Sequence, residues 1–152
     1  MRRSQYLSSF CLATFALVAC VPERSGIAGD RGSSALENVQ WTLIELEGAP
    51  IAAAAGGTPT ISLSSKDQRA SGFAGCNRYF GGYVLDGDGL RLTGLAATRM
   101  ACPDMSVEAA VLKALEATAA WKIDGRKLEL FDATGRLRSR WTATVIESGV
   151  KP

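Results

Sequence analysis

Short runs in which apolar and polar residues alternate fill most of the chain from residue 39 onward. Thr60–Ser64 alternates with a period of two, and Leu137–Val145 places Leu, Ser, Trp, Ala and Val on one face with Arg and Thr on the other. Such alternation is typical of half-buried antiparallel strands. By the same criteria, further strands are predicted at residues 41–46, 69–73, 77–85, 90–95, 121–123 and 128–131.

Turn signals separate these predicted strands. Asp86-Gly87-Asp88-Gly89 and Asp124-Gly125 each follow one strand and precede another, which predicts two β-hairpins. Asp132–Gly135 is a predicted turn of the same kind. Ala49–Thr58 is rich in Ala and Gly and contains Pro50, so we expect a loop there.

After Pro103 the period of the apolar residues becomes that of a helix, predicted from Asp104 or Ser106 to about Ala119. Asp104 and Glu108 put negative charge in its first turn, which suits a helix N-terminus. The apolar positions at helical spacing are Val107, Val111, Leu112, Leu115 and Ala119.

Together these elements predict a single α+β domain. Its expected architecture is a strongly bent antiparallel β-sheet or open barrel covered by one α-helix. A chain of 152 residues is long enough for one such domain and short enough to make a second unnecessary.

The N-terminus has a different pattern, because an uncharged and mostly apolar run over Leu7–Ala19 follows Arg2 and Arg3. This arrangement predicts a signal peptide over residues 1–19 that is removed on export. The segment Leu17-Val18-Ala19-Cys20 resembles the lipobox of bacterial lipoproteins. That resemblance implies a diacylglycerol on the Cys20 thiol, cleavage before Cys20, and an acylated new N-terminus. A plain secretory signal with an incidental cysteine is the alternative.

Residues 20–38 are then predicted to form the lipidated N-terminus and a flexible tether, since Pro, Gly and Ser recur there without an apolar period. The lipid bilayer is therefore an expected partner, through acylated Cys20. Val21 stands where the Asp that signals inner-membrane retention in enteric lipoproteins would be. In a Gram-negative host this favours the periplasmic face of the outer membrane.

Loss of the signal peptide changes the charge balance. The whole chain has 17 basic and 15 acidic residues and a net charge of +2, and removal of Arg2 and Arg3 makes the exported part neutral. A neutral domain gives no electrostatic reason to expect nucleic-acid binding.

Composition also restricts the chemistry, because the chain contains no histidine. This excludes Ser-His-Asp and Cys-His nucleophilic catalysis and the usual zinc sites. Asp86-Gly-Asp88-Gly weakly resembles a calcium loop but lacks the distal Glu, so a hairpin turn is favoured. We therefore expect no catalytic residues, no metal and no cofactor.

Cys76 and Cys102 remain once Cys11 leaves with the signal peptide and Cys20 receives lipid. An even pair of cysteines in an oxidising compartment predicts a disulfide, with two separate buried thiols as the alternative. The two are not in a Cys-x-x-Cys arrangement, so a catalytic redox pair is weakly supported.

Several separated segments resemble one known family. They are Trp41-Thr42-Leu43, Gly75–Gly81 with the sequence GCNRYFG, Thr98–Cys102 with the sequence TRMAC, Glu108 on the predicted helix, and the closing hairpin Leu128–Trp141. In this order they resemble the META domain, or HslJ-like, family over about residues 39–146. The resemblance implies a compact α+β domain, here residues 39–148, in exported or membrane-anchored bacterial proteins, some linked to envelope stress or drug tolerance. It implies no catalytic residue set.

Two groups of polar residues are candidates for binding. Asn77, Arg78, Thr98 and Arg99 lie within the family segments and are a candidate ligand or partner face; the alternative is structural, with Asn77 capping a turn. Arg136–Arg140 places an arginine at every second position of the last strand, which predicts a basic stripe. Such a stripe suits a solvated face that protects a sheet edge, or contact with anionic lipid or an acidic partner.

These observations favour a non-enzymatic binding or interaction module in the cell envelope, with an envelope protein or ligand as partner. A role in envelope stress tolerance is expected for this module, and a structural or chaperone-like envelope protein is the alternative. A thiol redox protein that uses Cys76 and Cys102 is the least favoured hypothesis.

Overall fold

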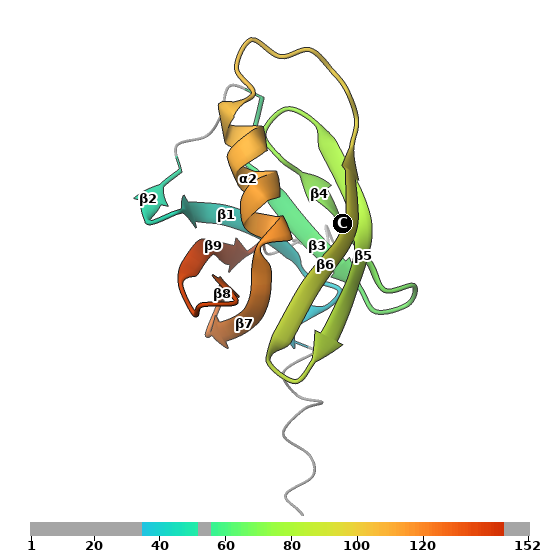
Figure 1. Ribbon diagram of the computed structural model, residues 1–152, viewed down its shortest axis with the longest axis vertical. Helices are drawn as coiled ribbons and strands as arrows, with labels where there is room; N and C mark the ends of the chain where they lie inside the picture. Colours follow the sequence, from blue (N-terminus) through green and yellow to red (C-terminus); the bar gives the residue numbers. More distant parts are fainter. Residues whose placement is uncertain (1–34, 52–55, 145–152) are drawn as a thin grey trace, which may run out of the picture.

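The computed structural model describes residues 35–51 and 56–144 (Figure 1). Nine strands form one antiparallel sheet, and the helix α2 (Ser106–Glu116) lies between the sixth and seventh of them in sequence. The strands are β1 (Gln40–Leu46), β2 (Ala49–Pro50), β3 (Thr60–Ser64), β4 (Arg69–Phe73), β5 (Arg78–Asp86), β6 (Gly89–Ala97), β7 (Thr118–Asp124), β8 (Lys127–Asp132) and β9 (Leu137–Ala143).

The sheet closes into a barrel, and here the prediction of an open barrel is wrong. β9 pairs with β8 on one side and with β1 on the other, from Trp41↔Ala143 to Leu46↔Ser139. Closure pairs the backbone N–H and C=O groups of β1 and β9 with each other, whereas an open sheet would leave these groups to bind water. The α+β class is confirmed, as a mostly β fold with one helix packed against the barrel near β6 and β1.

Inward positions of the alternating strands fill the barrel. The Trp141 indole is fully buried, and its Nε1 donates to Ser139 Oγ at 2.8 Å, so the buried polar atom is satisfied. Other large buried side chains on the strands include Trp41, Leu43, Ile61, Leu63, Tyr79, Leu90, Leu128 and Leu130, and α2 adds Val111 and Leu115.

Both predicted hairpins are confirmed. β5 and β6 meet at Asp86↔Gly89, and β7 and β8 meet at Asp124↔Lys127, so each turn has two central residues. The first central residue is Gly87 in one turn and Gly125 in the other, each with a φ of +59°. Glycine is favoured there because a side chain disfavours this left-handed conformation.

The helix is shorter than predicted, because Ala119 belongs to β7. The Thr118 hydroxyl donates to the Ala114 carbonyl at 3.0 Å just beyond the last helical turn. Asp104 Oδ1 accepts the Ser106 amide at 2.8 Å at the other end, as its position near the helix start suggested. In the described ranges, no helix is long and apolar enough to cross a bilayer.

Packing begins before the predicted start of the domain. Leu36 is fully buried, and its carbonyl accepts the Trp41 indole N–H at 3.0 Å. Glu37 accepts a hydrogen bond from the Tyr83 hydroxyl. The last residues assigned to the tether therefore belong to the folded part. Residues 1–34, with the predicted signal peptide and Cys20, lie outside the described residues.

The arginine row of the last strand lies on the outer face, as predicted, but its charges are matched there. Arg136 and Arg138 both pair with Glu47, at 3.0 and 2.6 Å, and Arg140 pairs with two further glutamates, Glu45 and Glu129. β9 has a neighbour on both sides, so the row protects no sheet edge. Because carboxylates surround these guanidinium groups, this face is a poor site for an anionic partner.

Asp132 lies beside this ion-pair network, in the predicted turn between β8 and β9. The Thr134 hydroxyl donates to its carboxylate and lowers the pKa of Asp132, and the backbone amides of Arg136 and Thr134 and the Arg138 charge act in the same direction. As the pH falls, the Asp132 carboxylate of the unfolded chain therefore becomes protonated at a higher pH than that of the folded protein. We expect the stabilisation to be complete above the ordinary pKa of 3.8 and to be lost as the pH falls below it.

Urea unfolding midpoints measured at a series of pH values check this expectation. Asp132→Asn keeps an acceptor oxygen at this position but cannot titrate, so its midpoint should fall less steeply below about pH 4 than that of the unaltered protein. Equal acid sensitivity of the two proteins would contradict the assignment to Asp132.

Candidate functional site

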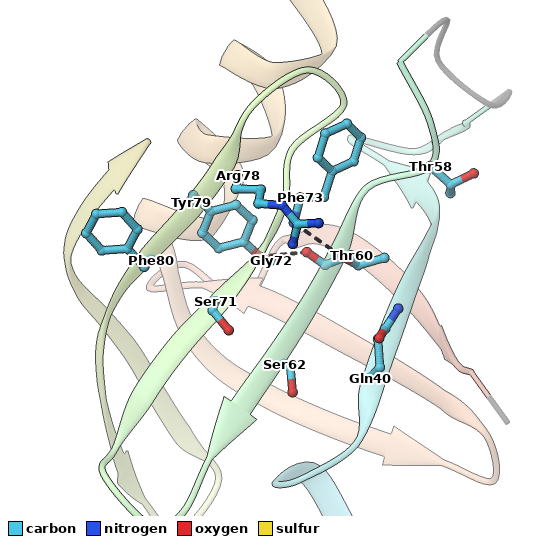
Figure 2. A pocket seen from close by; sticks show the side chains of 10 residues that line it. All are labelled: Gln40, Thr58, Thr60, Ser62, Ser71, Gly72, Phe73, Arg78, Tyr79 and Phe80. Carbon is cyan, nitrogen blue, oxygen red and sulfur yellow. Dashed lines mark hydrogen bonds between the residues drawn. The ribbon is translucent and has the colours of Figure 1, made fainter. Parts of the chain in front are cut away.

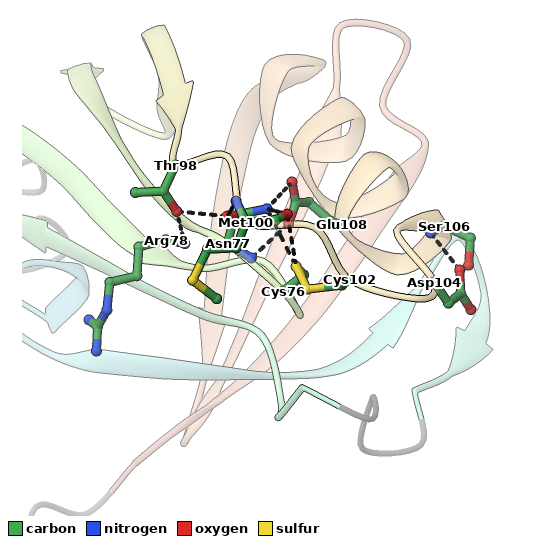
Figure 3. The surroundings of a disulfide bond; sticks show 9 residues. All are labelled: Cys76, Asn77, Arg78, Thr98, Met100, Cys102, Asp104, Ser106 and Glu108. Atoms are coloured by element: carbon green, nitrogen blue, oxygen red, sulfur yellow. Dashed lines mark hydrogen bonds between the residues drawn. A yellow bond between two sulfur atoms is a disulfide. The ribbon is translucent and has the colours of Figure 1, made fainter.

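The family segments meet where β5 begins. Cys76, two residues before β5, forms a disulfide with Cys102 in the loop between β6 and α2, with the two Cα atoms 6.3 Å apart (Figure 3). This Cα separation lies within the ordinary range for disulfides. The predicted bond is therefore present in the structure, and it holds the loop against the start of β5.

Asn77 is the centre of a buried hydrogen-bond network beside the disulfide, and it is fully buried. Its Oδ1 accepts the Met100 amide at 2.7 Å and the Thr98 hydroxyl at 2.8 Å. Its Nδ2 donates to the Met100 carbonyl at 3.3 Å and to Glu108 Oε1 at 3.2 Å. The side-chain amide thus uses both of its polar atoms to fix the loop that follows β6 (Figure 3).

Glu108 completes the network from the first turn of α2. Its Oε2 accepts the Asn77 backbone amide at 2.7 Å, and only 6% of its surface is exposed. A buried carboxylate requires hydrogen-bond donors, and Asn77 supplies two of them from its backbone and its side chain. The Glu on the helix and the Asn after Cys76 therefore form one structural unit.

This geometry divides the predicted ligand face. Asn77 is buried in the network and is therefore not part of an open surface. Its role is structural, which was the alternative to a role in ligand binding. Arg78, Thr98 and Arg99 are exposed. The Thr98 hydroxyl is nevertheless occupied, because it donates to Asn77 and accepts the Arg78 amide at 3.2 Å. The remaining residues of the face line two separate grooves.

The first, here called the loop groove, has a volume of about 630 Å³. It lies along the end of β6, the following loop and the start of α2. Met100 and Met105 are 60% and 41% exposed, so much of its surface is apolar. Its principal lining residues are Leu95, Ala97, Thr98, Arg99, Met100 and Met105.

The second, here called the outer groove, has a volume of about 580 Å³ and crosses the outside of β1, β3, β4 and β5 (Figure 2). Short hydroxyl side chains form its floor, and Arg78 extends from β5 across β4 towards β3 in this view. The principal lining residues are Gln40, Thr60, Ser62, Ser71, Arg78 and Phe80.

Gly72 makes a close approach beneath this groove. The Tyr79 hydroxyl donates to the Thr60 carbonyl at 2.9 Å, beside Gly72. A Cβ on Gly72 would lie 2.7 Å from that hydroxyl oxygen, too close for a side chain to fit. Burial raises the pKa of Tyr79 far above its ordinary value, so this hydroxyl stays a hydrogen-bond donor.

Sequence reasoning found only Arg78 among the residues of the outer groove. At the groove, the outward positions of β3 and β4 include Thr60, Ser62 and Ser71, where longer charged side chains are more usual on an exposed sheet face. That choice of short residues on adjacent strands was the available signal, but it needed the register of β3 and β4 to place Ser62 opposite Ser71.

The charges around the outer groove differ from those on β9. No acidic residue lines the groove within residues 35–51 and 56–144. Arg69 stacks over the Phe80 ring with 5.9 Å between its guanidinium carbon and the ring centroid. Neither Arg69 nor Arg78 has a carboxylate within ion-pairing distance in the described part of the chain. The described ranges also contain no group of three His, Cys, Asp or Glu side chains that could hold a metal ion.

Comparisons with known proteins agree with the fold and the family segments. The family model of the META domain matches residues 34–144. The NMR structure of a protein from Burkholderia xenovorans is similar with a TM-score of 0.60 and 29% identity, over 82% of this chain and 97% of that chain. The crystal structure of a DUF4847 family protein from Bacteroides vulgatus shares the fold at 14% identity and a TM-score of 0.55, over 72% of this chain and 95% of that chain. No curated protein matches the sequence.

Since the family match spans most of the chain, the protein belongs to the META domain family, and the resemblance inferred from its sequence is confirmed.

Proposed function

We propose that this META domain protein is an exported lipoprotein, held at the cell envelope by acylated Cys20, and that its barrel is a non-enzymatic binding module. The observation that carries the binding function is the outer groove, where Arg78 has no carboxylate partner in the described part of the chain and no acidic residue is among the described lining residues. Sites that bind ligands combine a concave surface with a few converging polar groups, and this groove has both features.

The anchoring part of the proposal is supported by the N-terminal sequence, where a basic start, an apolar run and Leu17-Val18-Ala19-Cys20 follow in the order that lipoprotein export requires. Two or more acyl chains anchor a protein stably, whereas a single chain binds only marginally. In a Gram-negative host, the periplasmic face of the outer membrane is the proposed location.

Replacement of Cys20 by alanine tests the anchor. We expect the unaltered protein to partition into the detergent phase and to carry a diacylglycerol and a fatty acid on its first residue by mass spectrometry. Cys20→Ala should stay unmodified and leave the detergent phase. Cys11→Ala is the matched control, because Cys11 lies inside the signal peptide and should not affect lipidation. An unmodified Cys20 in the unaltered protein would refute the anchor.

The binding part is tested by blocking the outer groove. Ser71 is exposed on β4 in the groove floor, so Ser71→Trp should fill the groove without entering the core. We expect the unaltered protein to retain a specific envelope component that Ser71→Trp loses. Val84→Trp is the matched control, since Val84 is 58% exposed further along β5 and does not line the groove. Equal retention by all three proteins, or no retention at all, would contradict a binding role for the groove.

A chaperone-like envelope role is the second candidate, and the loop groove is the observation that favours it. Methionine-rich surfaces adapt to varied apolar partners, and Met100 and Met105 are both exposed there. Suppression of aggregation of an unfolded client protein, lost on replacement of both methionines by lysine, is the expected result for this alternative. No effect at several-fold molar excess would remove it.

A further inference from the structure

Two rows of side chains cross the outer groove at right angles to the strands. One row joins Phe80, Ser71, Ser62 and Gln40, which are direct neighbours in the ladders of β5, β4, β3 and β1. Four adjacent strands span about 14 Å at the usual spacing between strands. The row is therefore long enough for a short chain of linked units, and larger than a single ion needs.

The second row runs beside the first and supplies the charge. It joins Arg78, Phe73 and Thr60 across β5, β4 and β3. Arg78 is exposed, and none of the described carboxylates pairs with it. A guanidinium in this setting favours a carboxylate or another planar anion, to which it can donate two parallel hydrogen bonds.

Apolar rings border the hydroxyl floor. Phe80 keeps 46% of its surface exposed although Arg69 stacks on it, and Phe73 is half-buried in the neighbouring row. Beside the rings, the hydroxyls of Ser62 and Ser71 can each donate and accept a hydrogen bond (Figure 2). The groove thus combines apolar faces with groups that suit a ligand whose own hydroxyls both donate and accept.

Resting on the proposed function, we propose that the outer groove binds an acidic glycan, a short chain of hydroxyl-bearing sugar rings with carboxylates. Arg78 pairs with a carboxylate, the serine and threonine hydroxyls bind ring hydroxyls, and the phenylalanine rings contact apolar ring faces. An extended peptide fits less well, because peptides commonly add a strand to a free sheet edge. Here β3 and β4 are paired on both sides, so the groove offers side chains and no free edge.

Calorimetric titration of the full lipoprotein in detergent micelles tests this inference. The probes are hexamers of alginate and of polygalacturonate, with a neutral mannose hexamer and hexaglutamate for comparison. We expect at least one carboxylated glycan to bind about tenfold more tightly than both comparison ligands, since a lost charged hydrogen bond changes affinity by about that factor. Binding should weaken with added salt.

Variants locate the binding. Arg78→Gln should lower glycan affinity about tenfold, and Ser71→Trp should abolish binding, with unchanged melting temperatures for both. Arg91→Gln is the matched control, because Arg91 is exposed on β6 and does not line the groove. An equal loss with Arg91→Gln, or equal binding of hexaglutamate, would reduce the effect to charge alone and overturn the glycan assignment.

Two further outcomes separate this inference from the function on which it rests. Equal binding of the mannose hexamer would refute the carboxylate part of the proposal. Failure of both carboxylated glycans to bind would overturn the glycan assignment, whereas retention of an envelope component that Ser71→Trp abolishes would leave the binding module standing. If no carboxylated glycan binds and no envelope component is retained, both the glycan assignment and the binding module are refuted.

Discussion

Replacing Asn77 by aspartate is expected to lower the free energy of unfolding by about 3 kcal/mol or more. The substitution keeps the shape of the side chain but exchanges its N–H donors for a carboxylate oxygen. That oxygen would lie about where Nδ2 now donates to Glu108 Oε1 at 3.2 Å and to the Met100 carbonyl at 3.3 Å. The new carboxylate oxygen would then face two acceptor oxygens, Glu108 Oε1 and the Met100 carbonyl, in a buried site, and it would bring a negative charge close to the Glu108 carboxylate.

The melting temperature should fall by about 10–20 °C for a domain of this size. Asn38→Asp is the matched control, because the Asn38 amide donates to Ser65 Oγ at 2.8 Å in an exposed turn, where water can replace it. We expect that control to change stability by less than about 1 kcal/mol. Thermal and urea unfolding of the two variants measure the difference.

Acid provides a second readout for Asn77→Asp. Protonation of the introduced carboxylate removes the repulsion and restores a donor, so the deficit relative to the unaltered protein should shrink as the pH is lowered. A deficit independent of pH, or a loss no larger than that of Asn38→Asp, would show that Asn77 and Glu108 do not form the buried unit described above.

Most strands and turns could be predicted because their signals are local, although β2 lies in a segment that was predicted to be a loop. Alternation in Thr60–Ser64 and a glycine at the first central position of each hairpin depend on neighbours in sequence, and both were confirmed. The end of the helix was placed too late because the alanines around Ala119 suit a helix as well as a strand. There, pairing of β7 with β8 decided between the two.

Closure of the barrel and the role of Asn77 could not be read in the same way. Leu43 and Trp141 are ladder partners that come from opposite ends of the domain sequence, and no local sequence pattern predicts that they pair. Asn77 resembles a turn residue in sequence, and only its contact with Glu108, 31 residues away, makes it the centre of a buried network. The outer groove likewise exists only through the register of β3, β4 and β5.

The disulfide gives the other large expected effect. Replacing Cys76 and Cys102 together by alanine should lower the free energy of unfolding by about 3.5 kcal/mol, because the bond closes a loop that its removal releases in the unfolded chain. The two residues are 26 positions apart. Reduction of the unaltered protein should produce the same loss, and unfolding in urea with and without a reductant measures both. The double variant is the control for the reductant, because it has no bond left to reduce and its stability should not change further.

The disulfide and the Asn77 network hold the same loop, so their effects should not add. Cys102 lies two residues after Met100, whose amide and carbonyl both bond to Asn77. Once one attachment is lost, the loop can move and the other attachment stabilises it less. The triple variant, which combines Asn77→Asp with both cysteine replacements, should therefore lose less stability than the two separate losses added together. We expect the difference to be at least about 1 kcal/mol. Strict additivity in this double-mutant cycle would mean that the two attachments act independently. An unchanged stability after reduction would mean that the bond constrains nothing in the unfolded chain.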